Sequence, residues 1–361
     1  MKILYIAPYN TVGTLNLWKQ AHNNKGNDCT FITLCQTNQH YDPGICLNLP
    51  LIKPSFLYIQ GRHLYYQLVR SKEGNYRKHI GYPPRWSPNS ILEKYYFNFR
   101  DWMWSFKVEP MIKKLKLYDY DVYHLEWGLE FYRDGRFVKK IKELNKPIIC
   151  TYHGIDLRSR GVIPDIDELS TLNLTSELDL MKIHPNLQYL FLPFDTSLYN
   201  PLFTINKPIR ICHSPRNRFY KGSDTIISIC REIEKNYNVE FVLIENKSHE
   251  ETLKIKESCD ILIDQIDNKG GWGYGMNSIE GLSMGLCCMT ELIPEYEQFI
   301  PDHPFININK NTLKNTLETL IDRPEKIKEF KQKSRKWVVQ YHDLNSVTNT
   351  LYDYYKVLGV L

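Results

Sequence analysis

The stretch KILYIAPYNTVGTLNLWKQAHNNKGNDCTFITL, residues 2–34, decides the fold. Residues 2–8 form an apolar run that predicts a buried strand, and Thr14 begins a segment whose apolar residues recur with helical spacing. Gly26 ends that helix, and residues 29–34 predict a second strand. A strand–helix–strand order implies a parallel sheet with a right-handed crossover. The stretch therefore predicts an α/β fold that opens with a βαβ unit.

The same alternation of strands and helices continues outward from this opening to the end of the chain. Further strands are predicted over residues 121–127, 147–152, 187–192, 209–213, 239–244, 260–265 and 286–290. Helices are predicted between several of them, over residues 129–144, 224–235 and 250–258 and in the segment that ends near residue 285. Two more follow from Pro324 onward, which suits the first position of a helix. A chain of 361 residues is too long for one hydrophobic core of ordinary size. We therefore expect two Rossmann-like domains facing a cleft.

Prolines between residues 193 and 208 mark the linker between the two halves. We therefore predict an N-terminal Rossmann-like domain over residues 1–194 and a C-terminal Rossmann-like domain over 195–340. A closing helix over 341–361 is expected to pack back toward the N-terminal domain.

Residues 54–118 interrupt the alternation and are rich in aromatic and basic side chains. We interpret them as a partly helical insertion over the N-terminal domain. Four roles suit this composition: stacking of an acceptor sugar on aromatic faces, contact with a membrane surface, binding of single-stranded nucleic acid, and an ordinary helical core. The composition does not separate these roles.

The bulk composition excludes some classes of protein. A net charge of +5 suits an enzyme of phosphorylated substrates or a protein near an anionic membrane, and it falls short of a dedicated nucleic-acid binder. The nine cysteines form no CxxC pair or zinc spacing, which indicates reduced thiols in a cytosolic protein. The sequence has no apolar run of roughly 18 residues. We expect a cytoplasmic protein that can rest at the inner face of the membrane.

A glycine-rich loop, NKGGWGYG over residues 268–275, opens a predicted helix that contains Glu280. Glycines let the backbone approach a ligand closely, and amides at a helix N-terminus attract phosphate. A carboxylate one turn inside the helix suits the paired hydroxyls of a ribose. The candidate binding residues here are Gly271, Trp272, Gly273, Tyr274, Gly275 and Glu280. The alternative is a flexible turn followed by a solvent-exposed glutamate.

A basic loop over residues 214–222 follows the predicted strand 209–213 directly. Arg216 and Lys221 could both reach a diphosphate and stabilise the charge that grows on a departing phosphate. The alternative is a basic surface loop.

His153 and Asp156 follow the predicted strand 147–152 at its carboxyl end, where open α/β sheets bind their ligands. His153 can hydrogen-bond a sugar hydroxyl. The alternative is a histidine that packs against the backbone.

Together the three elements resemble glycosyltransferase family 4 of the GT-B fold. The family's G-R-x4-K-G element is matched from Pro215 to Gly222, with both cations kept and the first glycine lost. Its E-x-F-G-x4-E element is matched from Trp272 to Glu280, with Trp272 in place of the first glutamate. The family's T-x-H element matches His153, and its N-terminal glycine loop matches weakly at Gly13. The resemblance extends over the chain except residues 54–118.

The resemblance implies a retaining transferase that uses a nucleoside-diphosphate sugar, without a bound metal or other cofactor. Arg216 and Lys221 would hold the diphosphate and Glu280 the ribose, while His153 would contact the donor sugar. The leaving phosphate itself would take the proton of the acceptor; Asp156 is the candidate base if the reaction inverts. The commonest acceptors in that family are glycans or lipid-linked glycans of an envelope. The resemblance implies that the N-terminal domain binds the acceptor and the C-terminal domain binds the nucleotide sugar.

Two other functions are consistent with the same sequence. A nucleotide-sugar 2-epimerase shares the two-domain fold, but it would need a set of carboxylates in the cleft, and the sequence identifies none. A degenerate glycan-binding protein would keep the fold without turnover, and Trp272 in the place of a glutamate motivates this alternative.

Overall fold

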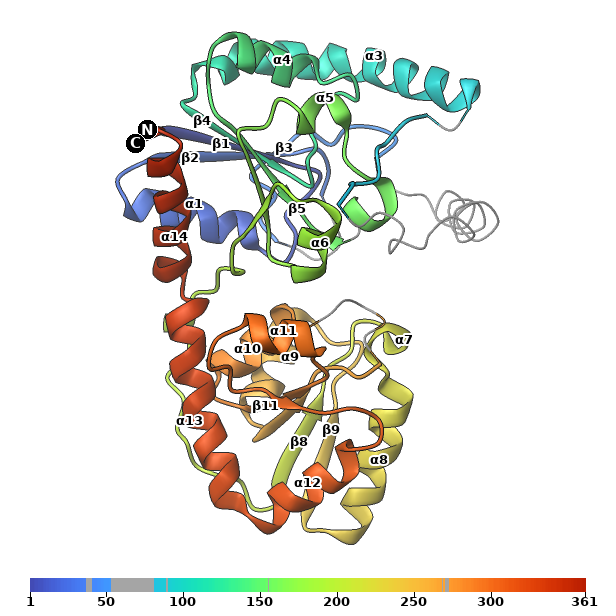
Figure 1. Cartoon of the computed structure of the whole chain (residues 1–361), viewed down its shortest axis with the longest axis vertical. Helices are drawn as coiled ribbons and strands as arrows, with labels where there is room; N and C mark the ends of the chain where they lie inside the picture. The colour runs from blue at the N-terminus through green and yellow to red at the C-terminus, as the bar shows by residue number, and fades with distance from the viewer. Residues whose placement is uncertain (37–40, 53–80, 89, 155, 268, 270–272) are drawn as a thin grey trace. The chain divides into compact units, whose positions relative to one another are not determined.

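The computed structural model describes residues 1–36, 41–52, 81–88, 90–154, 156–267, 269 and 273–361. The chain divides into two compact units: Met1–Phe191 with Thr348–Leu361, and Leu192–Val347. Each unit is an α/β layer structure around a parallel sheet (Figure 1). The predicted fold class, with two Rossmann-like units, is confirmed.

The first unit contains a seven-stranded sheet in the order β3-β2-β1-β4-β5-β6-β7, with every neighbouring pair parallel. Its strands are β1 (Lys2–Ala7), β2 (Asp28–Thr33), β3 (Ile45–Cys46), β4 (Val122–Glu126), β5 (Ile148–Tyr152), β6 (Leu172–Thr175) and β7 (Leu187–Tyr189). The predicted βαβ opening is present, with α1 (Thr14–Asn24) between β1 and β2. The strand order reverses between β1 and β4, which defines the switch point of this sheet.

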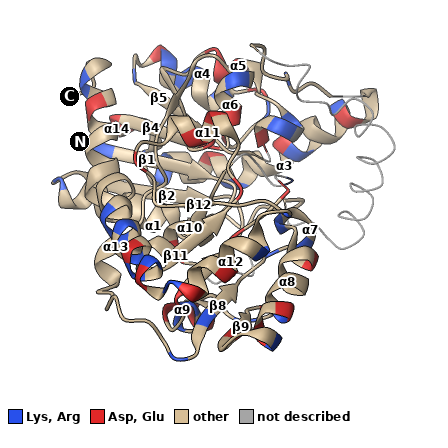
Figure 2. Cartoon of the chain, turned by 60° about the horizontal axis from the view of Figure 1, so that its bottom comes forward, with Lys and Arg blue, Asp and Glu red and all other residues tan. Residues whose placement is uncertain are grey.

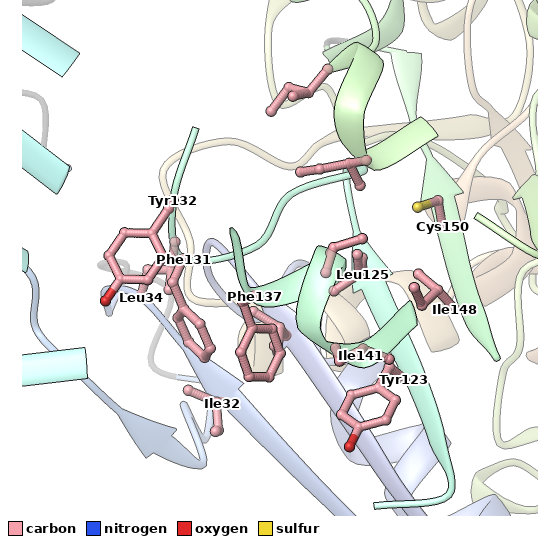
Figure 3. Packing of buried hydrophobic residues seen from close by; sticks show 14 of the residues in the cluster. Ile32, Leu34, Tyr123, Leu125, Phe131, Tyr132, Phe137, Ile141, Ile148 and Cys150 are labelled. Atoms are coloured by element: carbon pink, nitrogen blue, oxygen red, sulfur yellow. The ribbon is translucent and has the colours of Figure 1, made fainter. Parts of the chain in front are cut away.

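Both faces of the first sheet are apolar, as expected for parallel strands covered by helices on each side. Leu4 and Ile6 of β1 pack with buried residues of α3 (Ile91–Lys114) and α4 (Arg136–Glu143). Figure 3 shows this core, in which Phe137 and Ile141 of α4 lie over the strands. Two short helices, α5 (Pro164–Asp167) and α6 (Leu178–Ile183), follow β5 and β6.

The other face of the first sheet is covered by α1 and by α14 (Leu344–Val357) from the end of the chain. The hydroxyl of Tyr352 lies 3.0 Å from Nδ1 of His22, and the hydroxyl of Tyr355 lies 2.5 Å from Nε2 of His124. All four side chains are buried. The predicted packing of the last helix on the N-terminal half is therefore confirmed.

The second unit contains a five-stranded parallel sheet in the order β12-β11-β10-β8-β9. Its strands are β8 (Ile209–His213), β9 (Val239–Leu243), β10 (Ile261–Ile263), β11 (Cys287–Thr290) and β12 (Ile306–Asn307). Its helices are α7 (Arg218–Lys221), α8 (Ser223–Asn236), α9 (His249–Glu257), α10 (Met276–Ser283), α11 (Pro294–Phe299), α12 (Leu313–Asp322) and α13 (Pro324–Tyr341). The strand order reverses between β8 and β10, which is the switch point of this sheet.

The predicted elements differ from the structure in several places, and the short strands β3 and β12 and the helices α11 and α12 have no counterpart in the prediction. The helix expected over residues 129–144 begins only at Arg136, because Gly135 before it is left-handed (φ 67°) and the preceding Phe131 and Tyr132 are buried in the core. The strand β6 has no counterpart in the prediction. In the predicted insertion, α3 supplies the helical part, and residues 54–80 of it lie outside the described residues.

Two predictions from composition can be compared with the described part of the chain. All nine cysteines lie within it as free thiols, eight of them buried and Cys46 half-buried. Among the helices that the structure describes, none combines the length and the apolar character that a bilayer crossing demands.

Candidate functional site

The switch point of the second sheet brings together the chain segments that follow β8 and β10. Lys221, at the end of α7, donates from Nζ to Oδ1 of Asp264 at 2.6 Å and to Oε1 of Gln265 at 3.1 Å. Asp264 and Gln265 directly follow β10. Ligands of open α/β sheets bind at the carboxyl ends of the strands beside this point. The predicted cation Lys221 therefore lies where the fold favours a ligand.

Asp264 joins Lys221 to the start of α10. Its side chain is fully buried and also accepts hydrogen bonds from Nδ2 of Asn277 at 2.8 Å and from Oγ of Ser278 at 2.6 Å. Burial acts to raise the pKa of Asp264, but Lys221 and the two hydrogen bonds outweigh it, so the pKa is lowered. The ionised carboxylate thus fixes an ammonium group beside a helix N-terminus, a combination that attracts anions.

Two glycines of the predicted motifs are required by close packing. Gly222 follows Lys221 with φ 64°, and a Cβ there would lie 2.5 Å from Cγ1 and 2.8 Å from the backbone oxygen of Ile266. A Cβ on Gly273 would lie 2.0 Å from the ring of Tyr296. Gly275 is the N-cap residue of α10. Gly271 and Trp272, also predicted as binding residues, lie outside the described residues.

Glu280 of α10 is only 6% exposed, and both of its carboxylate oxygens have partners. Nε2 of His249 lies 2.9 Å from Oε1, and Nζ of Lys256 lies 2.5 Å from Oε2. The Lys256 side chain is buried, whereas that of His249 is 47% exposed. Burial acts to raise the pKa of Glu280, but His249 and Lys256 lower it overall, so the group stays ionised. The expected alternative, a solvent-exposed glutamate, is wrong.

The two predicted residues Lys221 and Glu280 belong to one continuous chain of hydrogen bonds. Nζ of Lys256 also donates to Oδ1 of Asn277 at 2.8 Å, and this bond completes the connection. The switch-point chain, as we name it, consists of Lys221, Asp264, Asn277, Lys256, Glu280 and His249. Four of its members were not identified from the sequence.

Arg216 and Tyr274 have different surroundings. Arg216 is exposed on the loop between β8 and α7. The hydroxyl of Tyr274 is hydrogen-bonded to Nε2 of His342 at 2.9 Å, and its ring packs against Phe305 and Trp337. Tyr274 thus anchors the loop before α10 to an aromatic cluster inside the second unit.

The switch point of the first sheet carries a second group of candidate residues. The rings of Tyr9, after β1, and Trp127, after β4, lie 5.0 Å apart in an edge-on arrangement. The ring of His153, after β5, lies 6.2 Å from that of Trp127. Gly13 is the N-cap residue of α1 at the same end of β1, with φ 76°. His153 therefore lies beside this switch point, as its place after a strand predicts.

His153 is paired with Glu126, the last residue of β4, through Nε2 and Oε2 at 2.9 Å. Its side chain is 27% exposed and that of Glu126 is 9% exposed. Burial acts to lower the pKa of His153, but the hydrogen bond and charge of Glu126, with Asp156 and Glu177, raise it to about 9. The ring is therefore an imidazolium at neutral pH.

Asp156 and Glu177 hold the backbone of the loop that carries His153. Both carboxylate oxygens of Asp156 accept the His153 backbone N–H, at 2.9 and 3.1 Å, and its buried position raises its pKa. The N–H of Gly154 donates to Oε1 of Glu177 at 2.7 Å. Arg158 in turn pairs with Glu177 at 2.5 Å. Asp156 is thus a positioning residue for His153 in this structure.

Two of the residues missed from the sequence share one signal. Glu126 and Asp264 are acidic residues at the carboxyl ends of predicted strands. Charged side chains are rarely buried in a sheet, so a carboxylate at such a position indicates a functional or paired group. Lys256 and His249 lie on α9 and carry no comparable signal. In the described part of the chain, no group of three or more His, Cys, Asp or Glu side chains is arranged to hold a metal ion.

Comparisons with known proteins support the fold independently. No protein-family model and no curated protein matches this chain. Sucrose-phosphate synthase from Thermosynechococcus elongatus is similar in structure, with a TM-score of 0.62, 10% identity and 99% of each chain covered. Anabaena HepE in complex with UDP has a TM-score of 0.58 at 11% identity, covering 99% of this chain and 100% of that one. A complex of HepE with UDP-glucose has a TM-score of 0.56 at 10% identity, with the same coverage. Likeness at these identities shows the fold, a GT-B type with two Rossmann-like units.

Proposed function

We propose that the chain is a glycosyltransferase that moves a sugar from a nucleoside-diphosphate sugar to a hydroxyl group of an acceptor. The observation that carries this proposal is the position of Lys221, which Asp264 holds at the switch point beside the start of α10. The HepE complexes contain UDP and UDP-glucose. Uridine nucleotides are therefore the first donors to test.

We assign the diphosphate to Lys221 and Arg216. An ammonium fixed at a helix N-terminus and a guanidinium on the adjacent loop would stabilise the charge that builds on the leaving phosphate. The buried carboxylate of Asp264 holds the ammonium group of Lys221 in place. We expect these charges to meet the diphosphate without a metal ion, so that activity persists in a chelator.

We assign the ribose to Glu280. Oε2 is fixed by the buried Lys256, while Oε1 faces the half-exposed His249. A ribose hydroxyl would donate a hydrogen bond to Oε1. The side chain of His249 would then lie beside the nucleoside. Gly271, Gly273 and Gly275 would let the backbone approach the donor, and Trp272 would stack on its sugar or base.

We assign the transferred sugar to His153 in its protonated form. An imidazolium donates hydrogen bonds from both ring nitrogens, and Glu126 takes one of them. The second N–H would donate to a hydroxyl of the donor sugar. In the retaining reaction that we propose, the bond from the anomeric carbon to the phosphate oxygen breaks. The acceptor oxygen bonds to the same face of that carbon, and its proton passes to the leaving phosphate.

We further propose a hexosyl group as the transferred sugar and a glycan or lipid-linked glycan as the acceptor. Such acceptors are consistent with a cytoplasmic enzyme that contacts the inner face of a membrane. Asp156 would act as a base only in an inverting reaction, and its hydrogen bonds to the His153 N–H favour the retaining alternative.

The proposal is tested by a thermal-shift panel of UDP, GDP, ADP and their sugar conjugates, followed by hydrolysis assays of the ligands that bind. A ligand at 100 times its Kd stabilises the fold by about 2.7 kcal/mol, which raises Tm measurably. Donor hydrolysis with release of the nucleoside diphosphate supports transfer. Conversion of the donor to an epimer without acceptor would instead identify an epimerase, and glycan binding without any nucleotide effect would identify the degenerate alternative.

A further inference from the structure

Helix α3 carries a row of large apolar side chains that point into solvent. The row, which we name the α3 stripe, has members 55–80% exposed: Leu92, Tyr95, Phe99, Trp102 and Phe106, with Ile91 at its start. Steps of three and four residues keep these side chains on one face of a helix. The ring of Trp102 lies 5.7 Å from that of Phe99 and 5.0 Å from that of Phe106. Phe99, Trp102 and Phe106 thus form a continuous aromatic surface within the stripe.

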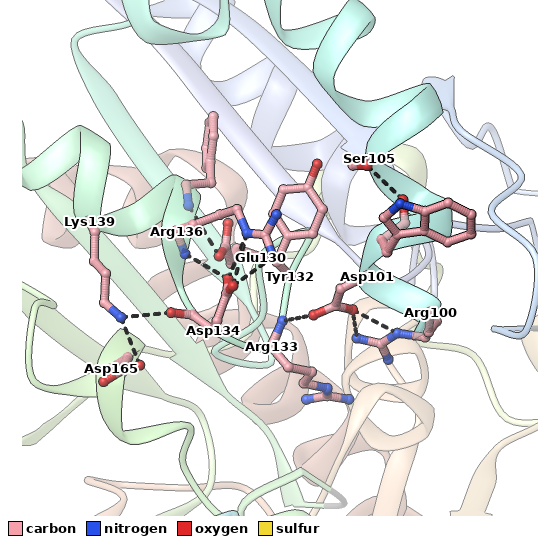
Figure 4. A network of polar contacts seen from close by, with 12 residues as sticks. Arg100, Asp101, Ser105, Glu130, Tyr132, Arg133, Asp134, Arg136, Lys139 and Asp165 are labelled. Carbon is pink, nitrogen blue, oxygen red and sulfur yellow. Dashed lines mark hydrogen bonds and ion pairs between the residues drawn. The ribbon is translucent and has the colours of Figure 1, made fainter. Parts of the chain in front are cut away.

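The opposite face of α3 packs into the core of the first unit. Trp104, Val108 and Ile112 belong to the core, and Nε1 of Trp104 donates to the backbone oxygen of Pro50 at 2.9 Å. The buried Asp101 pairs with Arg100 at 2.5 Å and accepts the Arg133 backbone N–H at 2.7 Å (Figure 4). The helix is therefore held by residues outside the stripe, and folding does not explain the exposed aromatic rings.

The exposed charges on α3, all of whose residues the structure describes, have one sign. The exposed charged residues are Lys94, Lys107, Lys113 and Lys114. The acidic residues are less exposed: Glu93 is half-buried, Asp101 is buried, and Glu109 is half-buried and accepts the hydroxyl of Tyr132 at 2.9 Å. Other helices, such as α8 and α13, carry both signs (Figure 2).

We propose that the α3 stripe docks on the surface of a bilayer that contains anionic phospholipid, with the helix lying flat in the interface. The stripe from Leu92 to Phe106 is about 21 Å long at 1.5 Å per residue. Aromatic side chains favour the boundary between head groups and acyl chains, and flanking lysines attract lipid phosphates. Large exposed apolar patches mark interaction sites, and the lysines select an anionic partner.

This inference names the surface for the membrane contact proposed above, and it does not depend on the donor site. Vesicle binding and stabilisation by nucleotides are separate measurements. Failure of one therefore leaves the other intact.

The test is co-flotation of the full chain with vesicles of phosphatidylcholine mixed with phosphatidylglycerol, and with vesicles of phosphatidylcholine alone. We expect binding to the mixed vesicles that weakens with salt. Trp102→Ser and Phe106→Ser should each weaken binding roughly tenfold, since each removes a large apolar side chain from the interface. Their matched control is Leu198→Ser with Leu202→Ser, which removes apolar side chains that are 66% and 79% exposed elsewhere.

The lysines are tested in the same assay. Lys94→Gln and Lys107→Gln should each weaken binding to mixed vesicles about fivefold. Lys235→Gln and Lys328→Gln, at exposed positions on α8 and α13, should leave binding unchanged. Thermal unfolding verifies that each variant is folded.

Three outcomes would overturn the proposal. The first is absence of binding to the mixed vesicles, and the second is equal binding by wild type and the folded Trp102→Ser, Phe106→Ser double variant. The third is a dimer in light scattering that this double variant converts to a monomer, which would identify the stripe as an interface between two copies of the chain.

Discussion

Nε2 of His153 lies 2.9 Å from Oε2 of Glu126, and this contact raises the pKa of the imidazole to about 9 although the ring is mostly buried. His22, His213 and His342 are also buried, and for each of them burial is the largest effect and lowers the pKa to about 4. The partner, and not burial, thus determines that His153 is charged at neutral pH.

Replacing Glu126 by Gln should lower the pKa of His153 from about 9, because the variant loses the hydrogen bond and the charge that oppose desolvation most strongly, while Asp156 and Glu177 remain. NMR titration of the His153 ring measures this directly. Under the proposed function, the loss of activity on the alkaline side should move to lower pH in the variant. Glu143→Gln, at an exposed site on α4, is the control. A His153 that still titrates near pH 9 in the Glu126→Gln variant would contradict this assignment.

The same contact has a consequence for stability. Because the pKa of His153 is higher in the folded state than in the unfolded state, the charged ring stabilises the fold. This contribution is complete below the unfolded pKa of 6.5 and is lost as pH rises through the folded pKa of about 9. The difference corresponds to about 3 kcal/mol. Urea titrations between pH 6 and pH 10 should therefore show a decrease in the free energy of unfolding of wild type, and a smaller decrease in Glu126→Gln.

Lys221→Met should abolish stabilisation by nucleotides and also lower the basal Tm, because Asp264 is left as a buried carboxylate without its cation. Adding Asp264→Asn should restore much of the basal Tm but no response to nucleotides. Thermal shift with and without UDP measures both effects. Lys254→Met, at an exposed site on α9, is the matched control. A normal UDP response in Lys221→Met would show that the nucleotide binds elsewhere.

Lys256→Met should destabilise the second unit by about 3–5 kcal/mol, the usual cost of breaking a buried ion pair from one side. Here the group left behind is Glu280, whose Oε2 loses the donor at 2.5 Å. The double variant Lys256→Met, Glu280→Gln should recover a large part of that loss. Urea unfolding gives the four free energies of the cycle. If the double variant is as unstable as the sum of the singles, the two groups do not interact in solution.

Acid should destabilise both units between pH 6.5 and pH 4. His22 in the first unit and His213 and His342 in the second are neutral in the fold, and burial lowers their pKa from 6.5 to about 4. As pH falls through this window the unfolded chain takes up protons that the folded chain cannot, so stability decreases by about 3 kcal/mol for each group. Urea titrations at pH 7, 5.5 and 4 measure the slope. His342→Gln should reduce it, and an unchanged slope in that variant would contradict the assignment.

The local pattern of residues determined most of the elements. The strand over residues 209–213 was predicted with its observed bounds, because Pro208 before it and the loop after it mark both ends. The helix from Pro324 and the βαβ opening were predicted for the same reason. The short strand β6 was missed because four residues carry too little periodicity, and its pairing with β5 creates it.

The sequence by itself placed His153, Arg216, Lys221 and Glu280 after strands or on the helix that follows, and it indicated two parallel sheets. Only the tertiary structure decided their partners: Glu126 for His153, Asp264 for Lys221, and Lys256 with His249 for Glu280. Helical and strand periodicities are local and can be read along the chain. Contacts between residues 27 or 43 positions apart depend on which strands become neighbours, and that order is fixed only when the sheet assembles.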